Sequence, residues 1–404
     1  MKAGTPASRP PVVVVGLDCI TGLQTARIFA GHGITVVGIA SDPGHYCCRT
    51  RACARIVEAD TNSEEELISA LVALGTSLDQ RAMIVPCTDL SVLAISRERS
   101  KLEDAYWIAL PDNEVVELLT DKASFAAYAE EHGLSIPQTA LLSTREDAEA
   151  AVNALTLPCV IKPPVKTRLW QLQSQEKVYK AETREEFLAI YDQMHELTSP
   201  LVAQEWIRGG ESEHFTCNGY FDRHSTPLVT FVTRKIRQWP PQTGVGSLAV
   251  EWRNDAVAEE TIRLFSSVGF WGLAYLELKR DAQTGQHYII EPNVGRPTGR
   301  SAAAEAAGVD LLYAMYCDVV GLPLPETRLE QRFVGSKWIY FGRDIRSALH
   351  YWRRDELSIR GWLSSLRGPK VDAVFSWRDP APFWFDLWRG VTLLWRAGYA
   401  AVRR

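Results

Sequence analysis

Short apolar runs alternate with amphipathic segments over the first 118 residues. Val12–Val15 is an uninterrupted apolar run that ends at Gly16, as expected of a strand buried on both faces of a parallel sheet. The same pattern predicts further strands at 34–39, 82–86 and 106–109, and a helix at 22–31. Strands that alternate with helices in this way predict a doubly wound α/β domain over residues 1–118.

The pattern changes after residue 118. Helices are predicted from Lys122 to Gly133, after the N-cap residue Thr183, and at 255–268. Strands are predicted at 158–163, 201–207, 214–220, 228–234, 273–279 and 287–293, with a loop at 238–247. Because several of these strands are joined by short turns, residues 119–328 are predicted to form an α+β domain rich in antiparallel strands.

Charge and tryptophan are divided unevenly along the chain. The net charge is -5, but residues 1–330 carry -13 and residues 331–404 carry +8. The last 74 residues also hold seven of the 13 tryptophans. An apolar content of 46% excludes a disordered chain. The acidity of the larger part argues against nucleic acid as a partner, because it would repel phosphates.

The cysteines and the termini predict a location. The eight cysteines lack the paired spacing of a metal site, and we interpret them as free thiols. No apolar run reaches the roughly 18 residues of a membrane span, and the N-terminal apolar run is too short for a signal peptide. We therefore expect a cytoplasmic protein.

A cluster of oxygen ligands is predicted on one strand pair. Glu291 and Asn293 are two residues apart and so share a face of their strand. If the hairpin is centred on Thr284, Glu277 lies directly across from Glu291, and two bare carboxylates would repel. A divalent cation would remove that repulsion, and three oxygen ligands suit Mg²⁺. A solvated polar face is the alternative, and the residues alone leave both open.

Three further segments carry candidate chemistry. Lys122 and Lys162 lie on separate segments, and phosphate positioning would explain both, although each alone is as well explained as an exposed lysine. The stretch from Gln204 to Glu213 is a strand followed by a turn with acidic residues, which suits an adenine edge and a ribose diol.

Together and in this order, these motifs resemble the ATP-grasp superfamily. The matching stretches are TDKASFAAYAEEHGLSIPQT, PCVIKP, VAQEWIRGGESE, YLELK and IIEPN. The runs TRKIRQWPPQTGVGSLA and FWGLAYLELKRDAQTGQHYIIEPNVGR are similar to the carboxylate–amine ligase branch, near D-aspartate ligase-like proteins. The resemblance covers roughly residues 10–325. It implies a Rossmann-like pre-ATP-grasp domain (1–118), a two-part ATP-grasp domain (119–328) and a helical C-terminal extension (329–404).

The resemblance implies a role for each matching residue. The residues expected to contact ATP are Lys122 and Lys162 at the phosphates, Glu205, Trp206 and Ile207 at the adenine, and Glu213 or Glu211 at the ribose. The residues expected to bind one or two Mg²⁺ (or Mn²⁺) ions are Glu277, Glu291 and Asn293, and the two expected at the reacting groups are Arg296 and Arg300.

The implied activity is ADP-forming amide synthesis. A carboxylate would attack the γ-phosphate of ATP to give an acyl phosphate, and an amine would then displace phosphate. A basic cluster, interpreted either as a clamp for the substrate carboxylate or as a solvated strand end, comprises Arg234, Lys235, Arg237 and Gln238.

Two departures from the family pattern stand out, and the first of them motivates a rival function. The segment after Lys162, PPVKTRLWQLQSQEKVYKA, lacks glycine, so Lys166, Arg168 or Lys177 would have to replace the usual backbone contacts to phosphate. The usual Asn-Pro-Arg is replaced by a stretch in which Arg296 stands one residue further on. The rival is a protein that binds nucleotide for regulation without turnover.

Residues 329–404 lie largely outside the resemblance. Helices are predicted at 357–366 and 383–404. The second would carry a narrow polar stripe that includes Arg389 and Arg396, with wide aromatic cover. Two interpretations stay open for residues 379–404: docking on the main body or a second copy of the chain, and peripheral contact with the inner face of the membrane.

Overall fold

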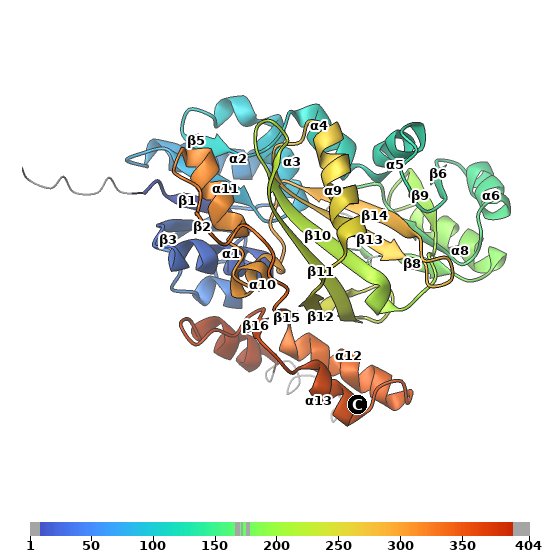
Figure 1. Ribbon diagram of the computed structural model, residues 1–404. Coiled ribbons are helices and arrows are strands. Elements are labelled where there is room, and N and C mark those ends of the chain that lie inside the picture. Colours follow the sequence, from blue (N-terminus) through green and yellow to red (C-terminus); the bar gives the residue numbers. More distant parts are fainter. Residues whose placement is uncertain (1–8, 166–169, 171–172, 175–177, 391–404) are drawn as a thin grey trace, which may run out of the picture.

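Three β-sheets make up the frame of the molecule (Figure 1). The computed structural model describes residues 9–165, 170, 173–174 and 178–390. In Figure 1 the parallel sheet lies on the left, a seven-stranded sheet in the middle and a four-stranded sheet on the right. The mixture of one parallel and two largely antiparallel sheets confirms the predicted change of architecture.

The N-terminal sheet is parallel, with strand order β3-β2-β1-β4-β5. Its strand β1 is wholly buried, as its apolar run predicts. Strand β3 was not predicted, because it lies at the sheet edge and its RIVE sequence has exposed ends and no apolar run. The elements of this part are β1 (Val12–Val15), α1 (Ile20–Gly31), β2 (Val36–Ala40), η1 (Tyr46–Arg49), β3 (Arg55–Glu58), α2 (Glu64–Thr76), β4 (Ala82–Pro86), α3 (Asp89–Arg97), η2 (Arg99–Lys101), β5 (Tyr106–Ile108) and α4 (Asn113–Thr120).

The four-stranded sheet is antiparallel, with order β6-β9-β7-β8. Both predicted helix starts are confirmed here: Asp121 accepts the Ser124 amide at the start of α5, and Thr183 accepts the Glu186 amide at the start of α8. The elements are α5 (Lys122–Glu131), β6 (Thr139–Leu142), α6 (Arg145–Ala154), β7 (Cys159–Lys162), β8 (Tyr179–Ala181), α8 (Arg184–Met194) and β9 (Leu201–Glu205).

The seven-stranded sheet has order β14-β13-β10-β11-β12-β15-β16. The loop predicted at 238–247 is shorter than expected, since β11 runs to Trp239 and β12 begins at Val245. The elements are η3 (Glu211–Glu213), β10 (His214–Phe221), β11 (Pro227–Trp239), β12 (Val245–Glu251), α9 (Asp255–Ser267), β13 (Gly272–Arg280), β14 (His287–Val294), α10 (Ser301–Ala306), α11 (Leu311–Val320), β15 (Lys337–Ile339), α12 (Phe341–Arg353), α13 (Ile359–Ser365), β16 (Lys370–Asp372) and an unlabelled helix at 381–390.

The C-terminal extension is part of this sheet, which corrects the prediction of an all-helical extension. Strand β15 pairs antiparallel with β12, and β16 pairs parallel with β15. Each has three residues, too few to show a period in the sequence. The helix predicted at 357–366 is confirmed as α13, and 381–390 covers the start of the last predicted helix; residues 391–404 lie outside the described residues. The division into three domains stays a prediction.

A buried ion pair ties α12 to the central sheet. Arg237 on β11 donates from two nitrogens to the carboxylate of Asp344 on α12, at 2.9 and 2.8 Å. Both side chains are buried, with 5% and 0% exposed. The Ser247 hydroxyl and the Trp362 indole also donate to Asp344. The carboxylate is thus surrounded by donors from three elements.

Removing this carboxylate should destabilise the protein strongly. Asp344→Ala leaves the buried Arg237 charge without its partner, so we expect the free energy of unfolding to fall by about 3–5 kcal/mol. The matched control is Asp255→Ala, which breaks an exposed pair with Arg253 and should cost less than about 1 kcal/mol. Urea unfolding measures both, and equal losses would show that the buried pair does not hold α12.

Candidate functional site

One pocket lies between the four-stranded and seven-stranded sheets, next to the start of α5. It brings together residues that are far apart in the sequence and come from both sheets. The sequence-predicted residues that line it are Lys122, Lys162, Glu205, Trp206, Ile207, Lys235, Gln238, Glu277 and Glu291. The residues predicted to contact phosphate, adenine and metal therefore line the same pocket.

The acidic pair of the pocket is set by the β13–β14 hairpin. Its antiparallel register places Glu277 directly opposite Glu291, as the sequence predicts. The Lys122 ammonium lies 3.7 Å from a Glu291 oxygen. Lys122 is the first residue of α5, and Asp121 caps the start of that helix. Asn293 lies beside the pair, with its amide nitrogen 3.4 Å from Glu291, while its oxygen accepts from Arg296 at 2.8 Å. Two opposed carboxylates fit Mg²⁺ or Mn²⁺.

Three buried lysines face the same space. Lys162 donates to Gln204, and Lys235 donates to Gln238, each at 2.9 Å. Lys279, on β13, is only 3% exposed. Burial, reinforced by repulsion from Lys235 and Lys180, lowers the pKa of Lys279 to about 8. Several buried cations in one pocket favour an anionic ligand, because an anion would offset their loss of hydration.

The side-chain nitrogen of Gln238 also favours a ligand. Gln238 is 1% exposed, and its Nε2 has no hydrogen-bond acceptor among the described residues. A buried donor without an acceptor costs about 1–3 kcal/mol. A ligand oxygen in this pocket would remove that cost.

The predicted hinge is partly used within the protein. The Glu205 amide donates to the Gln138 carbonyl and the Trp206 amide to the Pro158 carbonyl, both at 2.9 Å. The Trp206 ring lies between two ammonium groups, with Lys279 at 4.2 Å and Lys180 at 5.0 Å from its centroid. The hinge is thus rigid and lined by cations.

Comparison with known proteins identifies the architecture. No protein-family model matches the chain. Among solved structures, N5-carboxyaminoimidazole synthetase from Staphylococcus aureus has a TM-score of 0.60 at 15% identity, covering 78% of each chain. The biotin carboxylase domain of 2-oxoglutarate carboxylase from Hydrogenobacter thermophilus, solved with MgADP and bicarbonate, has a TM-score of 0.62 at 14% identity, covering 80% of this chain and 72% of that one. An L-amino acid ligase from Bacillus licheniformis has a TM-score of 0.59 at 15% identity, covering 77% and 74%.

The chain has the ATP-grasp fold. The fold that the motifs imply is therefore confirmed. Identities this low show the fold alone, and the finer resemblance to D-aspartate ligase-like proteins stays a prediction.

Several predicted residues lie outside the pocket of this ATP-grasp fold. Arg296 forms an ion pair with Asp89 at the start of α3 and donates to Asn293. Arg300 precedes α10 as its N-cap residue. Arg234 stacks on Trp252 and donates to the carbonyl of Ser212, and Arg237 is held by Asp344 as described above. Of the predicted carboxylate clamp, the structure brings only Lys235 and Gln238 into the pocket.

The two candidate ribose ligands are already bonded within the protein. Glu211 accepts hydrogen bonds from the backbone amide of Gln238 at 2.9 Å and from the Tyr351 hydroxyl at 2.5 Å. Burial raises its pKa. Glu213 pairs with the more exposed Arg280 at 2.7 Å. Glu211 thus holds the end of β11 in place. Glu213 is the better candidate ribose ligand, because its partner Arg280 is exposed and can be replaced by the ribose hydroxyls. Lys166, Arg168 and Lys177 lie outside the described residues.

Among the polar and charged residues that line the pocket, those for which the sequence predicts no individual role include Gln204, His214, Gln242 and Lys279. Lys279 carried a usable signal, since it stands two residues after Glu277 on one strand and so lies on the same face. Gln204 and His214 stand in strands whose register is not readable from the sequence.

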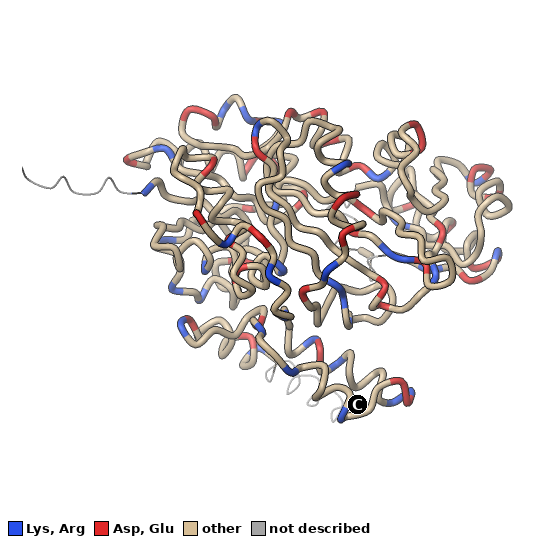
Figure 2. Tube along the Cα trace, in the orientation of Figure 1, with Lys and Arg blue, Asp and Glu red and all other residues tan. Residues whose placement is uncertain are grey.

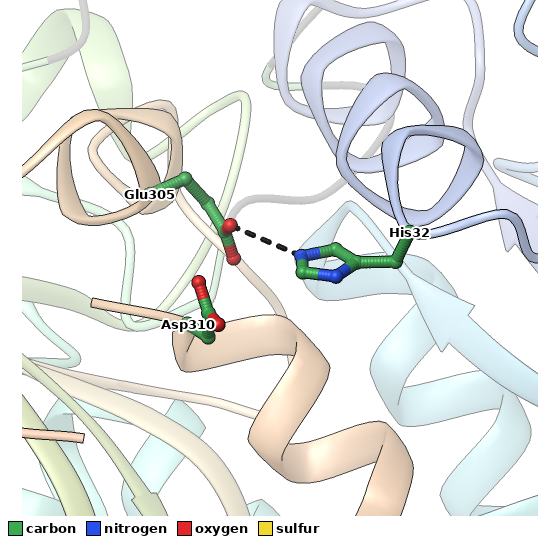
Figure 3. A group of neighbouring side chains, drawn as sticks. All are labelled: His32, Glu305 and Asp310. Carbon is green, nitrogen blue, oxygen red and sulfur yellow. Dashed lines mark hydrogen bonds and ion pairs between the residues drawn. The ribbon is translucent and has the colours of Figure 1, made fainter. Parts of the chain in front are cut away.

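A second group of metal-type side chains lies elsewhere, where α1 meets α10 and α11 (Figure 3). Ligand atoms of His32, Glu305 and Asp310 lie within 4.8 Å of one another, with His32 Nε2 3.3 Å from Glu305. Asp310, however, pairs with Arg328 at 2.7 Å, and His32 stacks on Tyr313. These contacts account for the three side chains as part of the packing between α1, α10 and α11, without a metal ion.

If this pocket takes a nucleotide, as the resemblance implies, the affinity for it should depend on the charge of Lys279. Lys279 is protonated below pH 8 and neutral above it, so MgADP should bind more weakly as pH rises from 7 to 9.5, by at most about 30-fold for a pKa near 8. Lys279→Met should bind MgADP more weakly at pH 7 and lose most of this dependence. Titration calorimetry measures both. Lys101→Met, at a lysine outside the pocket, is the control, and an unchanged pH profile in Lys279→Met would contradict the assignment.

Proposed function

We propose that the protein is an ATP- and Mg²⁺-dependent ligase that joins a carboxylate to an amine and releases ADP and phosphate. The observation that carries the proposal is the pocket itself, in which Lys122, Lys162 and Lys279 meet the opposed carboxylates of Glu277 and Glu291. The ATP-grasp fold supports the same conclusion. Two proteins of similar structure are a synthetase and a ligase by name, and a third was solved with MgADP.

ATP would lie with its phosphates toward the lysines and its adenine at the hinge. Because the amides of Glu205 and Trp206 are bonded within the protein, we propose the Ile207 amide as the donor to adenine. Glu213 would hold the ribose hydroxyls by exchanging its contact with Arg280. Gln238 would donate its buried amide to a ligand oxygen.

Glu277 and Glu291 would hold Mg²⁺, with Asn293 beside them; the ion would supply charge neutralisation at the phosphates. The oxygen of Asn293 is engaged by Arg296 in the structure, so its part in metal binding requires that contact to change. Lys122 already lies near Glu291 and would bind the phosphates beside that carboxylate.

The chemistry has two steps. A substrate carboxylate oxygen would attack the γ-phosphorus while the bond to ADP breaks, giving an acyl phosphate. The amine nitrogen would then attack the acyl carbon and lose a proton as phosphate leaves. Lys122 and Lys162 would hold the phosphates, and Lys235 the substrate carboxylate, since each is a compact positive charge in a dry pocket. Arg300 is the remaining candidate donor to the oxyanion, because Arg296 is held by Asp89; Arg300 also lies outside the pocket, so this role requires it to move toward the acyl group.

The position of Arg296 also favours the rival function, nucleotide binding without turnover. In the ATP-grasp pattern the arginine after the acidic strand faces the transferred phosphate. Here it lies outside the pocket in contact with Asp89 and Asn293. A regulatory protein would need the lysines and carboxylates of the pocket but not this arginine.

Loss of one carboxylate tests the ligase proposal. A screen of acid and amine pairs should find a pair that stimulates ADP and phosphate release, with the amide identified by mass. Glu291→Gln should lower kcat at least about 100-fold, because it removes one charge from the phosphate-binding centre. Glu260→Gln, on the surface of α9, is the matched control and should retain activity.

The outcomes separate the alternatives. Release of AMP and pyrophosphate would contradict an acyl phosphate route. MgADP binding by the wild-type protein without stimulated ADP release by any acid would favour the regulatory function.

A further inference from the structure

Helix α12 has its polar face inside and its apolar face outside. Phe341, Ile345, Leu349 and Trp352 recur at helical spacing and form one stripe, and each is 41–50% exposed. On the face that packs against the sheet, Asp344 is completely buried, in its ion pair with Arg237. A surface helix normally has the reverse arrangement.

Helix α13 lies beside this stripe, and further large apolar side chains are exposed on α13 and on the helix at 381–390. A groove of about 270 Å³ between α12 and α13 is lined almost entirely by apolar atoms of residues that include Ile345, Leu349, Trp352 and Ile359. The exposed large side chains that follow are Ile359, Leu363, Trp377, Trp384, Phe385, Leu387 and Trp388. Residues 341–388 hold 11 of the 17 large apolar side chains exposed in the described chain, so these exposed groups are concentrated in one segment.

Basic side chains are interleaved with these apolar groups. Residues 341–390 expose eight basic side chains against two acidic ones. The basic ones are Arg346, Arg353, Arg354, Arg360, Arg367, Lys370, Arg378 and Arg389. Figure 2 shows Lys and Arg along the layer that α12 and α13 form below the rest of the molecule. Together, the exposed apolar and basic side chains of residues 341–390 are called the C-terminal surface below.

We infer that the C-terminal surface binds the surface of a membrane that contains anionic lipid. Tryptophans exposed among basic side chains suit the interface between headgroups and acyl chains, where an amphipathic helix lies in the plane. The eight exposed basic side chains against two acidic ones give this surface an excess of positive charge, which is attracted to anionic lipid headgroups. Within the described part of the chain no helix is long and apolar enough to cross a bilayer, so the contact is peripheral.

This surface is independent of the proposed ligase activity. It also extends the sequence-based expectation, which placed membrane contact on residues 379–404 alone. The structure adds α12 and α13, and with them most of the exposed apolar stripe.

Vesicle flotation of the full chain tests the inference. The protein should float with vesicles of phosphatidylcholine that contain about 30% phosphatidylserine and much less with phosphatidylcholine alone. Binding should weaken between about 0.1 M and about 1 M salt, because the screening length falls from about 10 Å to about 3 Å. Leu349→Glu should reduce vesicle affinity at least about tenfold, since it removes an apolar side chain that would insert into the membrane and adds a negative charge.

A matched control separates this surface from general effects. Leu141→Glu, on β6, changes a leucine of similar exposure (48% against 41%) outside the C-terminal surface and should bind as the wild type does. Trp388→Ser, on the last described helix, is a second variant with a 70% exposed side chain and little risk to folding.

Unchanged flotation of both Leu349→Glu and Trp388→Ser would overturn the inference. The inference would also be overturned if the wild-type chain does not bind vesicles but self-associates in sedimentation, and Leu349→Glu is monomeric. The surface would then bind a second copy of the chain.

Discussion

The pairing of β13 with β14 is the constraint on which the site depends. It sets Glu277 directly opposite Glu291, an arrangement that costs free energy through repulsion. A shift of one residue is unfavourable, because Leu276 and Leu278 of β13 and Ile289 of β14 are buried in the hydrophobic core, and the strand that moved would expose its core side chains. Core packing thus holds two carboxylates together, and nearby cations such as Lys122 offset their charge.

Strand β11 links this pocket to the C-terminal extension. Lys235 and Arg237 are two residues apart and would share a face in a regular strand. The pairing with β12 is irregular on both sides of Arg237, and an irregularity of this kind turns a side chain out of its expected direction. Lys235 lines the pocket, whereas Arg237 reaches Asp344 on α12. One strand therefore supplies the candidate site and fastens the helix beside it.

The sequence predicted those features that local rules determine. Val12–Val15 is recognisable as a strand because every residue is apolar, and Thr284 marks the hairpin centre that pairs Glu277 with Glu291. Strands β15 and β16 were missed because three residues show no period. The role of Arg237 was not readable because it depends on an irregular pairing and on an acid 107 positions away.

Helix α12 shows a limit of amphipathic patterns. Such a pattern reveals which face is apolar, but it does not reveal which face points inward. The inner face of α12 is decided by Asp344, which satisfies the buried Arg237 and also accepts from Ser247 and Trp362. With that network fixed, the apolar stripe must face outward, where its contact with water is unfavourable. Helix α13 covers only part of the stripe, since each of the stripe's four side chains stays 41–50% exposed, and the surrounding excess of basic side chains favours an anionic surface as the proposed contact.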